Sequence, residues 1–185
     1  MLTRKEAEQI RQTAELIYSA EAIEKTVQRL ANEITAVLSE QNPLVLCVMK
    51  GGVVFAGHLL PKLIFPMNFD YVQVSRYHNE TSGGEINWIV FPQDCYKDRT
   101  VLVIDDILDE GITLEAIRKK VLDCGAKSFY SVVLVEKELG QIKPYQADFV
   151  GLILPNRYVF GFGMDIHGAW RNLPAIYALN SESEL

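Results

Sequence analysis

Residues 101–114 read VLVIDDILDEGITL, an apolar run that passes through a cluster of acids into the start of a helix. A continuous apolar run is typical of a strand that is buried on both faces of a parallel sheet. Asp105 and Asp106 follow the run Val101–Ile104, and in open parallel sheets ligands bind beyond the carboxyl ends of the strands. The stretch therefore predicts an α/β fold with a ligand site at the end of this strand.

The next five residues, Asp109, Glu110, Gly111, Ile112 and Thr113, must turn the chain sharply into the helix. A turn at a helix N-terminus offers backbone N–H groups and a favourable dipole to a phosphate. Gly111 permits close approach of the backbone, and the hydroxyl of Thr113 can donate to the ligand or cap the helix. Because acids alone would repel a phosphate, the pattern favours a ligand that carries a phosphate, sugar hydroxyls and a bound Mg²⁺. A solvated acidic turn is the alternative that these residues alone leave open.

Apolar runs alternate with helical periodicity along the rest of the chain. Helices are expected at residues 3–18, 20–38, 52–64 and 114–124. The first helix runs into a short strand near residues 16–18, and Ser19 is the expected N-cap of the second. Further strands are expected at residues 44–49, 69–75, 86–91, 129–135 and 149–154. This alternation predicts right-handed βαβ units and a twisted, mainly parallel sheet flanked by helices.

The segment from Pro155 onward is rich in glycine and aromatic residues and follows no regular repeat. We expect it to form a small hood lobe over the sheet. The whole chain, residues 1–185, is expected to be one domain. Its core would span roughly residues 40–140, and its hood would combine the N-terminal segment with roughly residues 145–185.

Composition limits the classes of function. The net charge of −6 argues against a general binder of nucleic-acid backbones. The three cysteines are far apart in the sequence, which argues against a disulfide framework or a zinc knuckle. The N-terminus is charged from Arg4 onward, and the longest apolar stretch, residues 53–65, is interrupted by polar residues and too short to span a bilayer. We therefore expect a cytoplasmic protein without membrane or nucleic-acid partners.

The stretch VLVIDDILDEGITL resembles the phosphoribosyl-diphosphate (PRPP) binding signature of type I phosphoribosyltransferases. Further matches between Leu44 and Leu179 resemble the hypoxanthine-guanine phosphoribosyltransferases. The resemblance implies a purine salvage enzyme that transfers the 5-phosphoribosyl group from PRPP to N9 of hypoxanthine or guanine. The products would be IMP or GMP and pyrophosphate, Mg²⁺ would be the cofactor, and the assembly would be a homodimer or homotetramer.

The resemblance also implies roles for the residues of the signature. Asp105 and Asp106 would bind the ribose hydroxyls and the Mg²⁺, and residues 109–113 would bind the 5′-phosphate. Asp109 would lie near N7 of the purine and act as general base or acid. Two positions depart from the family pattern, because Asp105 stands where Glu is commoner and Glu110 where Thr or Ser is usual.

The stretch VMKGGVVF resembles the family's pyrophosphate loop and implies that Lys50 and Gly51 contact the leaving group. A non-proline cis peptide bond often occurs in this loop, and here it would join Met49 to Lys50. Arg171, in DIHGAWRNLP, stands where the family has a second cation for the pyrophosphate.

Two further stretches resemble the base-binding segments of the family. VLVEKELG places Lys137 where a lysine contacts the exocyclic 6-oxygen of the purine. NRYVFGFGMD places Tyr158 where an aromatic ring stacks on the base, Val159 where the backbone reads the Watson–Crick edge, and Asp165 where a carboxylate binds the metal.

The loop that closes over the site in this family normally carries Ser-Tyr, whereas this chain has Ser75-Arg76-Tyr77. These three residues are the expected lid, with Tyr77 as the closing aromatic. Two other functions remain open: a PRPP-sensing regulator without catalysis, and a transferase that prefers xanthine, adenine or a pyrimidine. Lys137 and Tyr158 favour a 6-oxopurine but do not separate xanthine from hypoxanthine and guanine.

Overall fold

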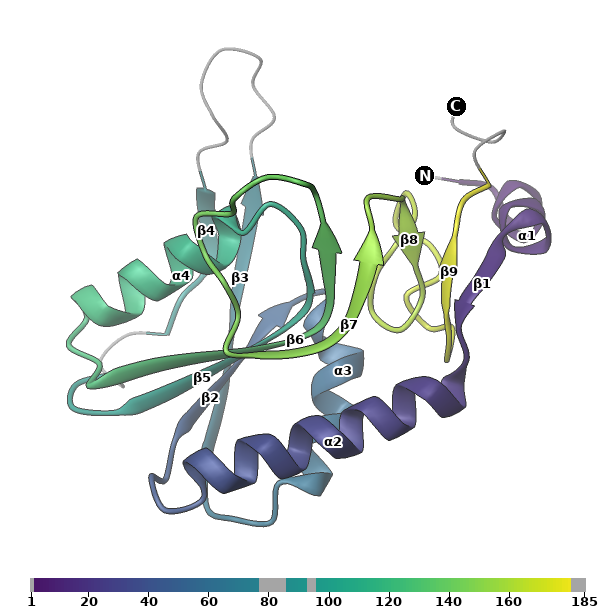
Figure 1. The fold of residues 1–185 in the computed structure, drawn as a ribbon. Helices are drawn as coiled ribbons and strands as arrows, with labels where there is room; N and C mark the ends of the chain where they lie inside the picture. Colours follow the sequence, from purple (N-terminus) through teal and green to yellow (C-terminus); the bar gives the residue numbers. More distant parts are fainter. Residues whose placement is uncertain (1, 77–85, 93–95, 181–185) are drawn as a thin grey trace.

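The computed structural model describes residues 2–76, 86–92 and 96–180. Within these ranges the chain forms two β-sheets and a set of helices (Figure 1). The helices are α1 (Arg4–Thr13), α2 (Ala20–Leu38), α3 (Gly52–Leu59), the 3₁₀ turn η1 (Leu60–Lys62) and α4 (Ile112–Asp123). The strands are β1 (Glu15–Tyr18), β2 (Leu44–Met49), β3 (Asn68–Arg76), β4 (Ile86–Val90), β5 (Thr100–Leu108), β6 (Ser128–Glu138), β7 (Phe149–Pro155), β8 (Val159–Phe160) and β9 (Ile176–Ala178).

The larger sheet has six strands in the order β4-β3-β2-β5-β6-β7. Strands β3, β2, β5, β6 and β7 are parallel, whereas β4 pairs with β3 in the antiparallel sense. Helices α2 and α3 lie on one face of this sheet and α4 on the other (Figure 1). The prediction of a twisted, mainly parallel α/β sheet flanked by helices is confirmed.

Strand β5 lies in the middle of this sheet and is apolar on both faces. Leu102 and Ile104 belong to the hydrophobic cluster under α2 and α3, and Val101 and Val103 belong to the cluster under α4. All four side chains are completely buried. The continuous apolar run arises because successive side chains of a strand point to opposite faces, and here both faces are covered.

Strand β5 continues beyond the point at which the sequence was expected to end it. Asp105 pairs with Val133 of β6, and the ladder runs on to the pair of Leu108 with Glu136. The two acids therefore lie inside the strand, not after Ile104 as predicted. The hydrogen-bond ladder with β6 overrides the low strand propensity of aspartate.

The helix boundaries follow local chemistry. The Ser19 hydroxyl accepts a hydrogen bond from the backbone N–H of Ala22 (3.3 Å), which confirms the predicted N-cap of α2. Helix α4 begins at Ile112, two residues before its expected start, directly after Gly111 with its left-handed φ of 82°. Among the described residues, no helix combines the length and the apolar character that crossing a membrane requires.

The smaller sheet joins the two ends of the described chain. Its strands have the order β1-β9-β8 and are antiparallel, so the N-terminal β1 lies against the C-terminal β9 (Figure 1). The segment after Pro155 was expected to be irregular, but it contains β8 and β9. Strands of two and three residues are too short to leave a periodic pattern in the sequence.

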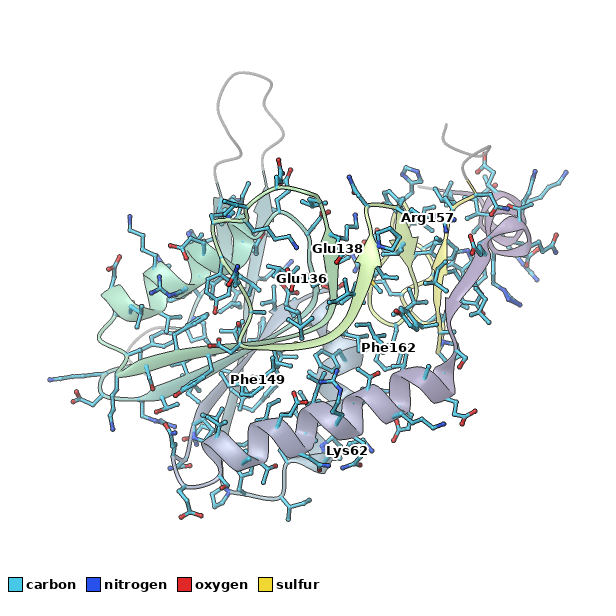
Figure 2. All side chains as sticks on the ribbon, in the orientation of Figure 1. Lys62, Glu136, Glu138, Phe149, Arg157 and Phe162 are labelled. Atoms are coloured by element: carbon cyan, nitrogen blue, oxygen red, sulfur yellow. The ribbon has the colours of Figure 1, made fainter. Side chains whose placement is uncertain are left out.

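Arg157 and Phe162, both labelled in Figure 2, are among the side chains that attach the smaller sheet to the rest of the molecule. Arg157 follows β7 and forms an ion pair with Glu15 of β1 (2.7 Å). It also donates a hydrogen bond to the carbonyl of Leu179 (2.9 Å). Phe162 is buried in the cluster that contains α2 and α3, and its ring lies 4.8 Å from that of His58. The chain after β8 thus reaches the core of the larger sheet.

We predict that Leu30→Ala lowers the free energy of unfolding by about 2–5 kcal/mol, because it leaves a cavity in the core. Leu30 is 0% exposed on α2, whereas Val37 on the same helix is 43% exposed. Urea unfolding followed by circular dichroism measures both variants. Val37→Ala is the matched control and should change stability by only about 0.5 kcal/mol. Equal losses in the two variants would contradict the assigned buried face of α2.

Candidate active site

A cavity of about 460 Å³ opens at the carboxyl ends of β2 and β5. It is bounded by the end of β2, the turn from β5 into α4, one residue of β3 and one cation from the chain after β8. Its lining residues are Val48, Met49, Gly51, Val74, Asp105, Asp106, Ile107, Leu108, Asp109, Gly111, Thr113, Leu114 and Arg171. The sequence predicted a ligand site at this edge, where the ligands of open parallel sheets bind.

Asp105 and Asp106 are buried carboxylates in the wall of this cavity, 7% and 8% exposed. The backbone N–H of Asp106 donates to Asp105 Oδ1 (2.9 Å), and that of Ile107 donates to Asp106 Oδ1 (3.0 Å). Burial raises the pKa of Asp106, and the hydrogen bond with Asp105 and the charge of Arg171 oppose this rise. Ionised Asp106 therefore carries an energetic cost.

Strand β5, the loop after β2 and the loop after β8 meet at Asp106, because each of the two loops carries a glycine at the contact. A Cβ atom on Gly51 would lie 2.0 Å from Asp106 Oδ2, and one on Gly163 would lie 2.2 Å from the carbonyl oxygen of Gly51. Gly163 also has a φ of 105°, which L side chains rarely adopt. Glycine at both positions therefore lets β5, the loop after β2 and the loop after β8 come into direct contact.

The predicted pyrophosphate loop lies at the end of β2. The peptide bond between Met49 and Lys50 is cis, as the resemblance implied. Gly51 lines the cavity, and Gly52 is the first residue of α3. Lys50 is exposed to solvent, and its backbone carbonyl accepts a long hydrogen bond from Val53 (3.5 Å).

Arg171 lines the cavity and is held by the loop after β8. Its Nη1 donates to the carbonyl of Gly163 (2.6 Å), and its Nη2 forms an ion pair with Asp165. The other carboxylate oxygen of Asp165 accepts a hydrogen bond from the backbone N–H of Gly168 (2.7 Å). The Tyr158 hydroxyl donates to the Asp165 carbonyl (3.4 Å), so this loop connects the cavity with Tyr158.

Lys137 and Asp109 form an ion pair across the ends of β5 and β6, with 3.1 Å between Nζ and Oδ2. The Lys137 side chain is 12% exposed and that of Asp109 is 42% exposed. Lys143 lies close to this pair and donates hydrogen bonds to the backbone carbonyls of Leu108 and Lys137 (3.1 and 2.6 Å). No sequence signal pointed to Lys143, because a lone lysine in a polar loop is usually a solvated charge.

The remaining predicted residues lie away from the cavity lining. Among the described residues, the lining does not include Lys137, Tyr158 or Val159, although Lys137 contacts Asp109. Tyr158 is 45% exposed with its ring 6.5 Å from that of His167, and Val159 is buried in the smaller sheet, where it pairs with Ala178.

Residues of the predicted lid and phosphate turn also differ in their positions. Ser75 is exposed near the end of β3, and Arg76 is the last residue of that strand. Tyr77 lies outside the described residues. In the phosphate turn, Gly111 and Thr113 line the cavity, whereas Glu110 and Ile112 are exposed and do not.

The donor set suits a hard cation that also binds the ligand. Within residues 2–76, 86–92 and 96–180, no three side chains of His, Cys, Asp or Glu are arranged to hold a metal ion by themselves. Asp105 and Asp106 offer neighbouring carboxylate oxygens at the cavity wall, whereas Asp165 is engaged by Arg171. Magnesium often binds through one or two carboxylates and completes its shell with water and phosphate oxygens of a substrate. The two aspartates fit that pattern.

Comparison with known proteins identifies relatives over most of the chain. A family model described as the phosphoribosyl transferase domain matches residues 13–167. The hypoxanthine-guanine phosphoribosyltransferase of Lactococcus lactis is 34% identical over 90% of this chain and 91% of that protein. The hypoxanthine-guanine-xanthine phosphoribosyltransferase of Tritrichomonas foetus is 32% identical over 87% of this chain and 88% of that protein.

Other relatives are longer. The chain matches the bifunctional protein TilS/HprT of Listeria innocua but spans only 26% of its length. Among solved structures, a hypoxanthine phosphoribosyltransferase from Staphylococcus aureus aligns with a TM-score of 0.88 and 26% sequence identity. That alignment covers 95% of this chain and 96% of the other. The fold similarity therefore extends over both sheets.

We predict that Gly51→Ala destabilises the fold by about 1–3 kcal/mol, because its methyl group would overlap the carboxylate of Asp106. Gly57→Ala is the matched control, since a Cβ atom there has no neighbour within 4 Å and Gly57 lies within α3. The control should be neutral or more stable by up to about 1 kcal/mol, owing to the helix propensity of alanine. Thermal and urea unfolding compare the two, and a Gly51→Ala protein as stable as Gly57→Ala would contradict this contact.

We predict that Asp106→Asn raises the free energy of unfolding at pH 7, because burial disfavours the charged form of the carboxylate and asparagine carries no charge. The pKa of Asp106 is raised in the folded state, so the native protein binds more protons and loses stability as pH rises above 3.8. The variant has no titrating carboxyl group at this position, so its stability does not fall in this way as pH rises. Urea unfolding from pH 3 to 7 should show a gain that grows with pH, and a variant less stable at pH 7 would contradict the prediction.

Proposed function

Because the chain belongs to the phosphoribosyltransferase family, we propose that it transfers the 5-phosphoribosyl group from PRPP to N9 of hypoxanthine or guanine. The products are IMP or GMP and pyrophosphate, and the pathway served is purine salvage. One observation carries the proposal: buried Asp105 and Asp106, the Gly51 loop, Arg171 and the Asp109 turn all line one cavity. Lys137 contacts Asp109 at the edge of this cavity.

The ribose phosphate of PRPP binds along the end of β5. The carboxylates of Asp105 and Asp106 accept hydrogen bonds from the ribose hydroxyls. Residues 109–113 bind the 5′-phosphate with the backbone N–H groups at the start of α4, and Thr113 adds its hydroxyl. The exposure of Glu110 supports this role for the turn, because its carboxylate lies outside the cavity lining.

The pyrophosphate group binds opposite, between Lys50, Gly51 and Arg171. Arg171 lines the cavity with a guanidinium already oriented by Gly163 and Asp165. As the bond from C1′ to pyrophosphate lengthens, negative charge grows on the leaving group, and fixed cations stabilise it most in the transition state. Lys50 is exposed at the loop and can turn its ammonium toward the same group.

The base binds beside Lys137, with Tyr158 stacked on the ring and the Val159 backbone at its Watson–Crick edge. Lys137 has only donors at neutral pH, so it complements the 6-oxygen of hypoxanthine or guanine. Asp109 forms an ion pair with Lys137 and therefore lies beside the base, where it acts as general base or acid for the proton of purine N7. The ion pair between Lys137 and Asp109 orients both side chains toward the base.

The cofactor we propose is Mg²⁺, bound with PRPP by Asp105, Asp106 and Asp165. When bound, Mg²⁺ supplies positive charge that neutralises the departing pyrophosphate. Asp105 and Asp106 provide the oxygen donors at the cavity wall. Asp165 would need to share its carboxylate between the metal and Arg171, with which it forms an ion pair.

The chain folds as one domain in this proposal, with the sheet β1-β9-β8 as its hood. Ser75, Arg76 and Tyr77 belong to a lid that excludes water from the reacting centre. The cytoplasm is the proposed compartment. No nucleic acid or membrane takes part.

A homodimer or homotetramer is the proposed assembly. It is supported by large apolar side chains that are 41–54% exposed on one face of the larger sheet, namely Phe69 and Tyr71 of β3 and Ile89 of β4. Their strand neighbours Val72 and Trp88 point to the opposite face, toward α4. Exposed apolar patches of this kind are typical of subunit interfaces.

Release of pyrophosphate from PRPP tests the function directly. The purified protein is assayed with Mg²⁺ and, in turn, hypoxanthine, guanine, xanthine and adenine. Turnover with hypoxanthine or guanine and little with adenine supports the proposal. Xanthine is included because the relative from Tritrichomonas foetus carries that base in its name. Binding of PRPP without turnover on any base would contradict the enzyme and favour a PRPP-sensing regulator.

We predict that Lys137→Gln narrows the ratio of kcat/KM between hypoxanthine and adenine by about 10-fold or more, because an amide can donate or accept whereas an ammonium only donates. Tyr158→Ala is the contrasting variant. Its ring meets only the face of the base in this proposal, so it should weaken all purines alike. If Lys137→Gln lowers kcat/KM equally for every base, Lys137 does not read the 6-oxygen.

A further inference from the structure

Lys143 is a buried cation in the loop between β6 and β7. Its side chain is 7% exposed, and its Nζ has three acceptors within hydrogen-bond distance. These are the carbonyl of Leu108 (3.1 Å), the carbonyl of Lys137 (2.6 Å) and Oε1 of Glu136 (3.1 Å). An ammonium has three donors, so all of them are used.

The three acceptors come from the ends of two neighbouring strands. Leu108 is the last residue of β5 and directly precedes Asp109, and Glu136 and Lys137 lie near the end of β6 (Figure 2 labels Glu136). The pairing between the strands ends with Leu108 and Glu136. Asp109 lies beyond this last pair, and at that point Lys143 bridges the two backbones.

The loop that carries Lys143 is itself anchored. The Tyr145 hydroxyl lies 2.8 Å from Ser131 Oγ in β6 and 3.2 Å from a carboxylate oxygen of Asp148. A Cβ atom on Gly111 would lie 3.4 Å from Lys143 Cβ and 3.2 Å from the Tyr145 carbonyl. Residues 143–145 therefore pack directly under the turn that precedes α4, and the position of Nζ is determined by packing.

Stability alone does not account for this arrangement. Moving an ammonium out of water is costly, and buried ion pairs often contribute no net stability compared with apolar residues. Lys143 pairs with Glu136, and the next residue, Lys137, pairs with Asp109. The pair of Lys143 with Glu136 is the more buried of the two. Lys143 also donates to the backbone carbonyl of Lys137, the cation of the second pair.

We propose that Lys143 is a positioning residue that sets the distance between Lys137 and Asp109 and thereby the selectivity for the base. The inference rests on the proposed function, in which Lys137 contacts the 6-oxygen and Asp109 exchanges the N7 proton. Both groups must meet one rigid purine, so a small displacement of either weakens the contact with the correct base.

The test compares the selectivity of four proteins: wild type, Lys143→Met, Lys137→Gln and the double variant. Lys143→Met keeps most of the side-chain volume and removes the ammonium. It should lower kcat/KM for hypoxanthine by about 10-fold and narrow the ratio of hypoxanthine to adenine. Lys143→Met/Lys137→Gln should discriminate between hypoxanthine and adenine as well as Lys137→Gln alone does, because Lys143 acts through Lys137. A role in stability alone would lower kcat/KM for all bases equally and leave the ratio unchanged, which would overturn the proposal.

Two further variants control for folding. Lys143→Met leaves the Glu136 carboxylate without its ammonium, so Lys143→Met/Glu136→Gln removes both charges and should show the same narrowed ratio. Lys25→Met is the matched control, since Lys25 pairs with Glu21 on the surface of α2 with both side chains at least 75% exposed. It should leave the ratio at the wild-type value. If Lys143→Met/Glu136→Gln keeps the wild-type ratio of kcat/KM between hypoxanthine and adenine, the proposal is overturned.

Hydrogen exchange measures the bridge without turnover. Peptides that cover residues 106–113 and 136–140 should exchange faster in Lys143→Met than in wild type, while peptides of α2 keep their protection. Unchanged protection in the first two peptides would overturn the positioning role even if the wild type showed no transferase activity. If the wild type is inactive and Lys143→Met still exchanges faster, the two results separate. The inactivity refutes the proposed function, and the faster exchange establishes the bridge between β5 and β6.

Discussion

The close contact of three backbones around the Asp106 carboxylate is the constraint on which the site depends. Gly51 and Gly163 lack the Cβ atoms that would lie 2.0 Å from Asp106 Oδ2 and 2.2 Å from the carbonyl oxygen of Gly51. Their absence lets the loop after β2 and the loop after β8 meet the centre of the larger sheet. Arg171 reaches the cavity through this contact, because it is hydrogen bonded to the backbone of Gly163.

The charges of the site form a second constraint that opposes stability. Asp105 and Asp106 are buried in the cavity wall, and burial raises the pKa of Asp106. Burying a carboxylate disfavours its charged form unless cations or hydrogen bonds compensate. Arg171 supplies part of the compensation. In the proposed function a bound metal and ribose hydroxyls would complete it, so the carboxylate whose charged form is disfavoured by burial would also bind the substrate.

Much of the fold could be predicted from local patterns. The run LVLCVM was predicted as a strand at residues 44–49, and β2 has those bounds. Ser19 caps α2, and the cis peptide after Met49 lies where the resemblance placed it. The end of β5 was predicted wrongly, because aspartates do not look like strand residues and only the pairing with β6 keeps them in the strand. The strands β8 and β9 were missed because they are too short to show a period.

The sequence by itself determined the α/β class, the buried strand of residues 101–104 and the cluster of acids at its end. These follow from apolar patterning, helix caps and a local motif, all of which act between residues near in the chain. The tertiary structure alone decided that Gly163 would touch Gly51 and that Lys143 would bridge β5 to β6. Such contacts depend on excluded volume and on burial between segments far apart in the sequence, and no pattern along the chain encodes which segments will meet.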